Sequence, residues 1–223
     1  MHPVSQALAA SSLIYIADPL CSWCYGFGPE LTKLLDGLPG MPLDIVVGGL
    51  RAYNTEMMDD AMRQTLQSHW RRVEQATGLP FRYDVLERPG FIYDTEPACR
   101  AVVTARQLAP QATLAVFHAI QHAFYAEAQE ATDGKVLAEI AVAALRQAGF
   151  AVDAEAFHAL WADEATAAAT RDEFIQTQRW GITGFPTLVL EHDGKLELVA
   201  AGFARTDVLA ERLRELTQTL PQH

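Results

Sequence analysis

Short apolar runs near the start of the chain predict the first two strands. The run Leu13 to Ala17 ends at Asp18-Pro19, which is typical of a buried strand that stops where proline begins a new element. A helix from about Leu20 to Leu35 follows, and the β-branched run 42–50 predicts a second buried strand. Strand, helix and strand at this spacing predict a βαβ unit with a right-handed crossover.

The middle of the chain has a helical pattern. From about Thr55 to Arg179 the sequence is rich in Ala, Leu, Gln and Glu and has few β-branched runs. Apolar residues recur there at helical spacing. The first such stripe consists of Met58, Met62, Leu66 and Trp70. We interpret the stripes as faces that pack against neighbouring helices.

Strand character returns near the end of the chain. Two apolar runs, 186–191 and 196–200, flank His192-Asp193-Gly194-Lys195, and Asp-Gly between such runs predicts an antiparallel hairpin. The closing stretch from Thr206 to Leu220 is amphipathic and predicts a last helix, capped by Thr206 or Asp207.

Composition and charge exclude several kinds of partner. Half of the 223 residues are hydrophobic, which is enough for a core without covalent staples. The formal net charge is -11 and the 17 basic residues form no run, which argues against nucleic acid. No apolar stretch is long enough to span a bilayer, so we expect no membrane association. Met1 to Ser12 has no Lys or Arg to begin a secretory signal, and we therefore expect a cytoplasmic protein.

Two of the three cysteines stand close together at the start of the first predicted helix. Three cysteines cannot all pair with one another, so we expect Cys21 and Cys24 to serve a reaction and not a structural disulfide. The unpaired N–H groups and the dipole at a helix start favour the thiolate of the first cysteine. Cys21 is the expected nucleophile. Cys24, one turn further, is the expected resolving thiol that attacks the mixed disulfide.

A zinc site is the main alternative for this pair. The further ligands would be Cys99, His118 and His122, but they lie much further from Cys24 than in familiar zinc modules. We therefore expect no metal. Cys99 begins a predicted helix and is expected to pack as a small apolar residue, with a reactive role as the alternative.

Two other positions each have a structural and a functional interpretation. Pro186 opens a strand after Gly184-Phe185, so it is either an ordinary trans proline or part of a tight loop with a cis Phe185–Pro186 bond. Asp18 either fills a turn position before a proline, which we favour, or is a buried carboxylate that relays a proton to Cys24.

Together these features resemble the DsbA-type thioredoxin-fold oxidoreductases over nearly the whole chain. The segment Asp18-Pro19-Leu20-Cys21-Ser22-Trp23-Cys24-Tyr25 is similar to the Asp-x-x-Cys-Pro-Trp-Cys-Tyr element of the cytoplasmic, FrnE-like and protein disulfide isomerase branch. His122-Ala123-Phe124-Tyr125-Ala126-Glu127 resembles the aromatic helix segment of that branch.

The resemblance implies an α/β protein with a thioredoxin fold and a large all-helical insertion. Residues 1–54 would be the βαβ half with the cysteine pair, 55–179 the insertion, and 180–223 the half with the hairpin and the cis-proline loop.

The resemblance also implies roles for the residues around the cysteines. Pro186 would be the cis-proline that faces the disulfide, and the backbone of Phe185 would pair with an extended substrate polypeptide. Ser22 and Trp23 would tune the stability of the thiolate. Because no histidine stands between the two cysteines, we expect a weaker oxidant than DsbA.

The implied function is that of a thiol–disulfide oxidoreductase of the reductase or isomerase type. It would act on protein or small-thiol disulfides, without a cofactor other than the Cys21–Cys24 pair and with glutathione as a co-substrate. One alternative is the kappa-class glutathione transferase and hydroxychromene-carboxylate isomerase group, which typically has serine where Cys21 stands. Another is a redox-inert binding module with the same fold.

Overall fold

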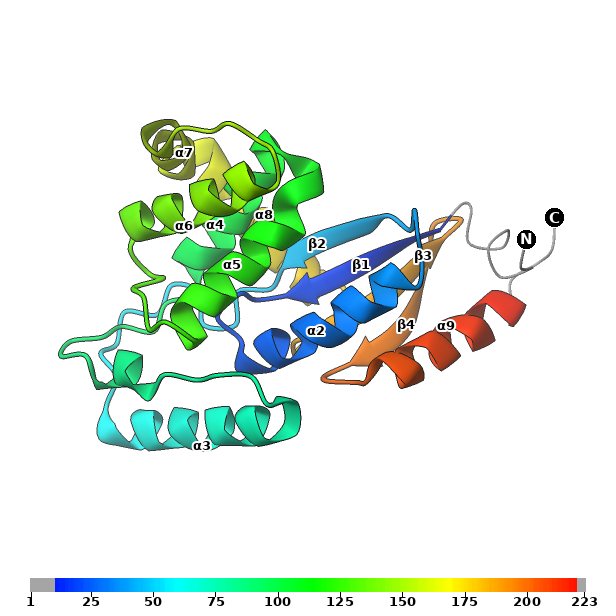
Figure 1. The fold of residues 1–223 in the computed structure, drawn as a ribbon, viewed down its shortest axis with the longest axis horizontal. Helices are drawn as coiled ribbons and strands as arrows, with labels where there is room; N and C mark the ends of the chain where they lie inside the picture. Colours follow the sequence, from blue (N-terminus) through cyan, green and yellow to red (C-terminus); the bar gives the residue numbers. More distant parts are fainter. Residues whose placement is uncertain (1–10, 220–223) are drawn as a thin grey trace.

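The computed structural model describes residues 11–219, which form a four-stranded sheet and eight α-helices (Figure 1). The strands are β1 (Ser11–Ala17), β2 (Leu43–Val47), β3 (Thr187–His192) and β4 (Lys195–Ala201). The helices are α2 (Ser22–Asp36), α3 (Asp60–Thr77), α4 (Glu96–Leu108), α5 (Thr113–Tyr125), α6 (Gly134–Gln147), α7 (Ala154–Trp161), α8 (Glu164–Arg179) and α9 (Thr206–Thr219), with 3-10 helices η1 (Tyr83–Glu87) and η2 (Pro110–Ala112).

The predicted βαβ unit is confirmed. Strands β1 and β2 are parallel, with Leu13 opposite Leu43 and Ala17 opposite Val47, and α2 connects them. The helix begins at Ser22 and not at Leu20, because Cys21 keeps an extended backbone with φ -87° and ψ 119°.

The predicted hairpin is confirmed as well. Asp193 and Gly194 form its two-residue loop with φ of 50° and 74°, the left-handed conformation that such a turn requires. Strand β3 lies antiparallel to both β1 and β4, so the sheet order is β2-β1-β3-β4. The end of β1 and the start of β3 therefore meet at one end of the sheet, next to the start of α2.

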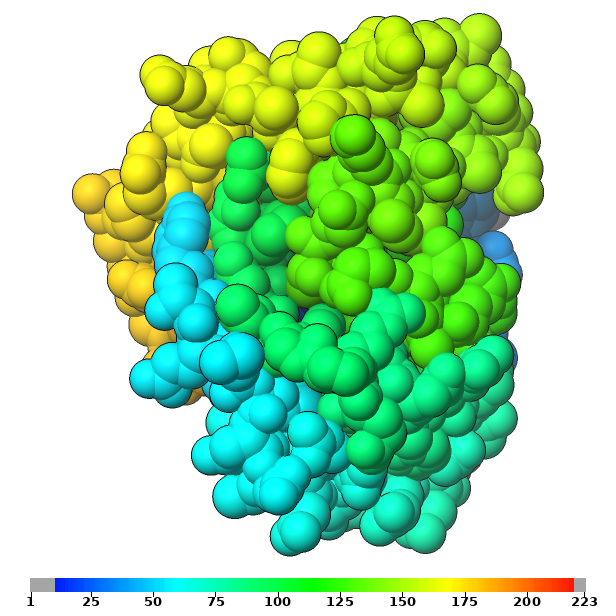
Figure 2. All heavy atoms as spheres, turned by 90° about the vertical axis from the view of Figure 1, so that its left-hand side faces the viewer, coloured from blue at the N-terminus to red at the C-terminus, as the bar shows by residue number. Residues whose placement is uncertain are grey.

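The helices cover one face and one end of the sheet. Helices α2 and α9 pack together along one face (Figure 1), where Tyr15 of β1 contacts Phe27 of α2. The insertion helices gather beyond one end of the sheet and fill the face seen in Figure 2. In the part of the chain that the structure covers, no helix combines the length and the apolar character needed to cross a membrane.

The first predicted helix of the insertion starts later than its apolar residues suggested. Helix α3 starts only at Asp60, because the side chain of Asp59 accepts a hydrogen bond from the Met62 N–H and caps it. Met58 lies before the helix, where its N–H donates to the carbonyl of Phe91. An isolated antiparallel bridge between Met57 and Ile92 accompanies this contact, a small β feature in the insertion that was predicted to be helical.

The last helix is confirmed, but its predicted caps are wrong. Helix α9 begins at Thr206, so Thr206 and Asp207 lie inside its first turn. A residue of α2 supplies the capping oxygen, since Glu30 accepts hydrogen bonds from the N–H and the hydroxyl of Thr206. The predicted end of this helix at Leu220 lies outside the described residues. So does most of the segment Met1 to Ser12, from which we expected no secretory signal.

Candidate functional site

The two neighbouring cysteines occupy the start of α2. Cys21 is the residue directly before the helix, and its carbonyl accepts the first helical hydrogen bond from Tyr25 N–H. No side chain caps this helix start, so the N–H groups of its first turn have no side-chain acceptor. Cys21 is 6% exposed and Cys24 is fully buried, and both are free thiols.

The Phe185–Pro186 loop contacts the first cysteine at the end of the sheet where β1 stops and β3 begins. The peptide bond between the two residues is cis. The thiol of Cys21 donates to the carbonyl oxygen of Phe185 over 3.6 Å, although the residues are 164 positions apart. The carbonyl of Pro186 accepts from Gly202 N–H at 2.7 Å, which ties the loop to the end of β4. The structure thus brings Cys21, Phe185 and Pro186 together.

The side chain of Phe185 depends on a glycine from another loop. A Cβ at Gly48 would lie 2.1 Å from two ring carbons of Phe185, so only glycine leaves room for the ring. Gly48 directly follows β2, and its N–H donates to the carbonyl of Ala17. The sequence analysis missed this role.

The residues between the cysteines differ in their surroundings. Trp23 is half-buried, and its ring lies 5.7 Å from the ring of Phe203, in the loop before α9. Ser22 is also half-buried, and it is the first residue of α2. Phe203 is a neighbour of the site that no sequence motif indicated.

Asp18 is fully buried beneath the cysteines and is more than a turn residue. Its Oδ1 accepts from Leu20 N–H at 2.8 Å, as a turn residue would, but its Oδ2 accepts from Leu50 N–H at 2.7 Å. Burial raises the pKa of this carboxyl, and the hydroxyl of Thr95 and the two backbone N–H groups oppose that shift.

Cys24 lies in an environment that keeps its thiol protonated. Burial raises the pKa of Cys24 well above the ordinary value, and its hydrogen bond with Cys21 acts in the same direction. The Asp18 carboxylate also raises the pKa of Cys24 by charge repulsion. A proton must therefore leave Cys24 before it can act as a nucleophile.

Cys99 packs in the core as expected, but it also contacts the site. It is fully buried in α4, and its thiol donates to Asp18 Oδ2 over 3.5 Å. Interpreting Cys99 as only a small apolar residue was incomplete, because the sequence does not reveal that α4 lies next to the end of β1.

Two buried tyrosines hold the backbone just before the nucleophile. The hydroxyls of Tyr93 and Tyr125 both donate to the carbonyl of Leu20, the second at 2.5 Å. This fixes the peptide group between Leu20 and Cys21. Tyr125 belongs to the segment that resembles the family's aromatic helix, whereas no motif pointed to Tyr93.

The candidate ligands of the zinc alternative have separate environments. Cys99 contacts Asp18, His122 lies 3.5 Å from the Glu127 carboxylate, and His118 is half-buried beside Gly28. Among the described residues, no three His, Cys, Asp or Glu side chains are placed to share a metal ion.

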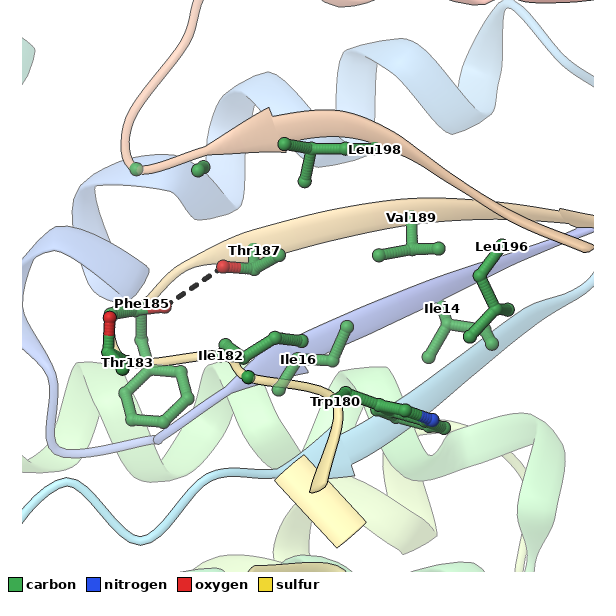
Figure 3. Close-up of a pocket in the computed structure, with 14 residues that line it drawn as sticks. Ile14, Ile16, Trp180, Ile182, Thr183, Phe185, Thr187, Val189, Leu196 and Leu198 are labelled. Atoms are coloured by element: carbon green, nitrogen blue, oxygen red, sulfur yellow. Dashed lines mark hydrogen bonds between the residues drawn. The ribbon is translucent and has the colours of Figure 1, made fainter. Parts of the chain in front are cut away.

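An apolar groove begins at Phe185 and follows the face of the sheet formed by β1, β3 and β4 (Figure 3). Its volume is about 620 Å³. The ring of Phe185 lies at one end of it, and Ile14 and Leu196 lie at the other. Phe185 is therefore shared between this groove and the surroundings of Cys21.

Comparison with known families gives a match over nearly the whole chain. The model of the DSBA-like thioredoxin domain matches residues 13–214. The chain belongs to this family. As a DSBA-like thioredoxin domain it has the expected α/β thioredoxin fold with a helical insertion between its βαβ half and its hairpin half.

Comparison with solved structures supports the same family assignment. The "putative protein disulfide isomerase" from Nitrosomonas europaea is 31% identical, with a TM-score of 0.84, over 93% of this chain and 98% of that one. The cytosolic disulfide reductase DsbM from Pseudomonas aeruginosa is also 31% identical, with a TM-score of 0.73 and the same coverage. This DSBA-like chain therefore resembles the cytoplasmic branch expected from its motifs.

The alternative enzyme group shares the fold at lower similarity. A 2-hydroxychromene-2-carboxylate isomerase is 15% identical, with a TM-score of 0.59, over 92% of this chain and 94% of that one. This likeness concerns the fold alone. A search of curated proteins finds no match to this DSBA-like chain.

Proposed function

We propose that the protein is a thiol–disulfide oxidoreductase of the reductase or isomerase type, with Cys21 as nucleophile and Cys24 as resolving thiol. The observation that carries the proposal is the position of Cys21, at an uncapped helix start and 3.6 Å from the carbonyl of Phe185 in a cis-proline loop. A substrate strand paired with Phe185 would present its disulfide to Cys21.

The proposed reaction has two exchange steps. In the first, the Cys21 thiolate attacks one sulfur of the substrate disulfide, the substrate S–S bond breaks, and one substrate thiolate leaves. In the second, the Cys24 thiolate attacks Cys21 Sγ, which releases the other substrate sulfur with its bonding electrons. The substrate gains two electrons, and the Cys21–Cys24 pair becomes a disulfide. A dithiol or two molecules of glutathione would reduce it again.

Asp18 is the proposed proton acceptor for Cys24. Cys24 is fully buried, and its raised pKa means that it needs a base for the second step. Asp18 is fully buried and its charge acts on Cys24, and a carboxyl with a raised pKa exchanges protons nearer to neutral pH than an ordinary one. We therefore choose the relay role for Asp18 over the turn role that the sequence favoured.

Glutathione and extended polypeptides are the proposed partners, and the cytoplasm is the proposed location. One solved structure of the cytosolic reductase DsbM holds glutathione, and it is 29% identical to this chain. In a reducing compartment Cys21 and Cys24 would be mostly thiols, which favours reduction or isomerisation. The expectation of a weaker oxidant than DsbA stays a prediction.

Trapping with Cys24→Ala tests the proposal. Without a resolving thiol, the mixed disulfide on Cys21 should persist after exposure to cell extract. Non-reducing gels and mass spectrometry should then show partner proteins bound through Cys21. The control variant Cys21→Ala should trap nothing.

The outcomes separate the three candidate functions. Trapped proteins support the oxidoreductase. Glutathione as the sole adduct supports the glutathione-dependent alternative. No adduct on either variant contradicts the oxidoreductase and leaves the redox-inert binding module.

A further inference from the structure

A third thiol lies under the redox pair and comes from the insertion. Cys99 is fully buried in α4, and its Sγ lies 3.5 Å from Asp18 Oδ2. The two residues are 81 positions apart, so the contact exists only because α4 packs against the end of β1. The proposed exchange reaction gives Cys99 no role.

The contact adds to the set of donors that surround the Asp18 carboxylate. The Thr95 hydroxyl binds it, as do two backbone N–H groups, Leu20 at Oδ1 and Leu50 at Oδ2. The Cys99 thiol is a further donor on Oδ2, and it reduces the rise in the pKa of Asp18 that burial causes. Hydrogen bonds of this kind stabilise the charged form of a buried carboxyl.

Cys99 remains a donor throughout the working pH range. Burial raises its pKa well above the ordinary value, and repulsion from Asp18 and, more weakly, from Glu96 adds to this. A protonated thiol in contact with a carboxylate donates to it. This environment makes Cys99 a poor nucleophile.

We propose that Cys99 is a positioning residue of the redox site, whose thiol holds the Asp18 carboxylate in place to take the proton of Cys24. The inference rests on the proposed function, because it assigns Cys99 to the second exchange step. In that step the proton of Cys24 moves to Asp18, Cys24 Sγ bonds to Cys21 Sγ, and the substrate sulfur leaves with the electron pair. Cys99 keeps its own proton.

Other ionisable groups also face Asp18 and contribute to its titration. They are Cys24 of α2, Tyr93 from the loop before α4, Tyr125 of α5, and Cys99 of α4. Substitution at Cys99 leaves the others in place, so a change in the titration of Asp18 reports on the single lost donor.

The test compares variants with and without a donor at position 99. Cys99→Val and Cys99→Ala lose the donor, Cys99→Ser keeps one, and Val102→Ala is a control for loss of volume at another buried position of α4. The rate of the second exchange step is measured by stopped flow with a fluorogenic peptide disulfide from pH 5 to pH 9.

Loss of the donor should make Asp18 a base only at higher pH. We expect the pH midpoint of the second step to move up by about half a pH unit in Cys99→Val and Cys99→Ala, as for the loss of one hydrogen bond. Cys99→Ser and Val102→Ala should stay closer to the wild type. A Cys99→Val midpoint equal to that of the wild type overturns the proposal, as does a Cys99→Ser midpoint equal to that of Cys99→Val.

A second readout separates this inference from the proposed function. The carboxyl carbon of Asp18 is titrated by 13C NMR in the reduced wild type and in the Cys99 variants. An upward shift in Cys99→Val, but not in Cys99→Ser, supports the positioning role even if the wild type exchanges no disulfide. An unchanged titration overturns it, whether or not the protein is an oxidoreductase.

Discussion

A single residue decides whether the Phe185–Pro186 loop can reach Cys21. The ring of Phe185 fits against the backbone at Gly48, where a Cβ would lie 2.1 Å from it. The same residue offers its carbonyl to Cys21. Because protein interiors are close-packed, a methyl group at position 48 must displace the ring or the loop.

Gly48→Ala is therefore expected to damage both the fold and the site. We expect it to lower the free energy of unfolding by about 1–3 kcal/mol, as overpacking does, and the rate of disulfide exchange by about tenfold or more. Denaturant unfolding and a peptide-disulfide assay measure the two effects. For stability, Gly184→Ala is the matched control, because its Cβ would meet no atom within 4 Å. Equal stability of the two variants would contradict this account.

At the scale of elements, the start of α9 depends on α2. Glu30 Oε2 accepts from the Thr206 N–H at 2.8 Å and from the Thr206 hydroxyl at 2.6 Å. The hydroxyl of Thr206 is the largest cause of the lowered pKa of Glu30. A side chain of one helix thus satisfies a free N–H of another and joins the first and last helices of the sheet layer.

Glu30→Ala should weaken this junction in a pH-dependent way. The cap is worth about 1 kcal/mol at neutral pH by analogy with other caps. Because the folded protein lowers the pKa of Glu30, this stabilisation is present above the unfolded value of 4.5 and is lost as the pH falls through the folded one. Denaturant unfolding of wild type and variant should therefore differ at pH 7 and converge in acid. Glu215→Ala, which alters an exposed ion pair of α9, is the control. If the stability difference between wild type and Glu30→Ala is the same at all pH values, the Glu30 carboxylate is not its cause.

At the scale of the whole molecule, the insertion is fastened to the edge of the sheet. Arg106 of α4 forms an ion pair with Glu173 of α8 and donates to the carbonyl of Ile45 in β2. Glu173 also accepts from the N–H of Val47 at 2.9 Å. The pKa of Glu173 is raised because burial outweighs the attraction of Arg106. Without Arg106 the carboxylate would be left unpaired in a largely buried place.

Arg106→Met is expected to loosen this junction. The pair is only partly buried, so its loss should cost less than the roughly 3–5 kcal/mol of a fully buried one, and we expect the free energy of unfolding to fall by about 2 kcal/mol. Hydrogen exchange should rise at β2 and at the facing turns of α4 and α8. Arg82→Met removes an exposed pair with Asp84 and should cost less than about 1 kcal/mol. If Arg106→Met and Arg82→Met lose the same stability, the Arg106–Glu173 pair does not hold the insertion to β2.

Sequence patterns were sufficient for features that depend on neighbours along the chain. The hairpin at Asp193-Gly194 and the βαβ unit follow from local turn chemistry and apolar runs. Element starts were less accurate: the local cap of α3 at Asp59 was overlooked, and the capping oxygen of α9 comes from Glu30 of a distant helix. The cysteine pair was found from local chemistry, and the family resemblance added the roles of Phe185 and Pro186 beside it.

The sequence by itself determined the order of the elements and the placement of Cys21 and Cys24 at a helix start, because these depend on periodicity and local backbone chemistry. The fold class came from the family resemblance that these features carry. Only the tertiary structure decided which distant groups surround them. The carbonyl of Phe185, the thiol of Cys99 and the hydroxyl of Tyr93 reach the site from positions at least 70 residues along the chain from it. Such contacts depend on how helices pack against the end of a sheet, and that packing is set by the shape of the whole core.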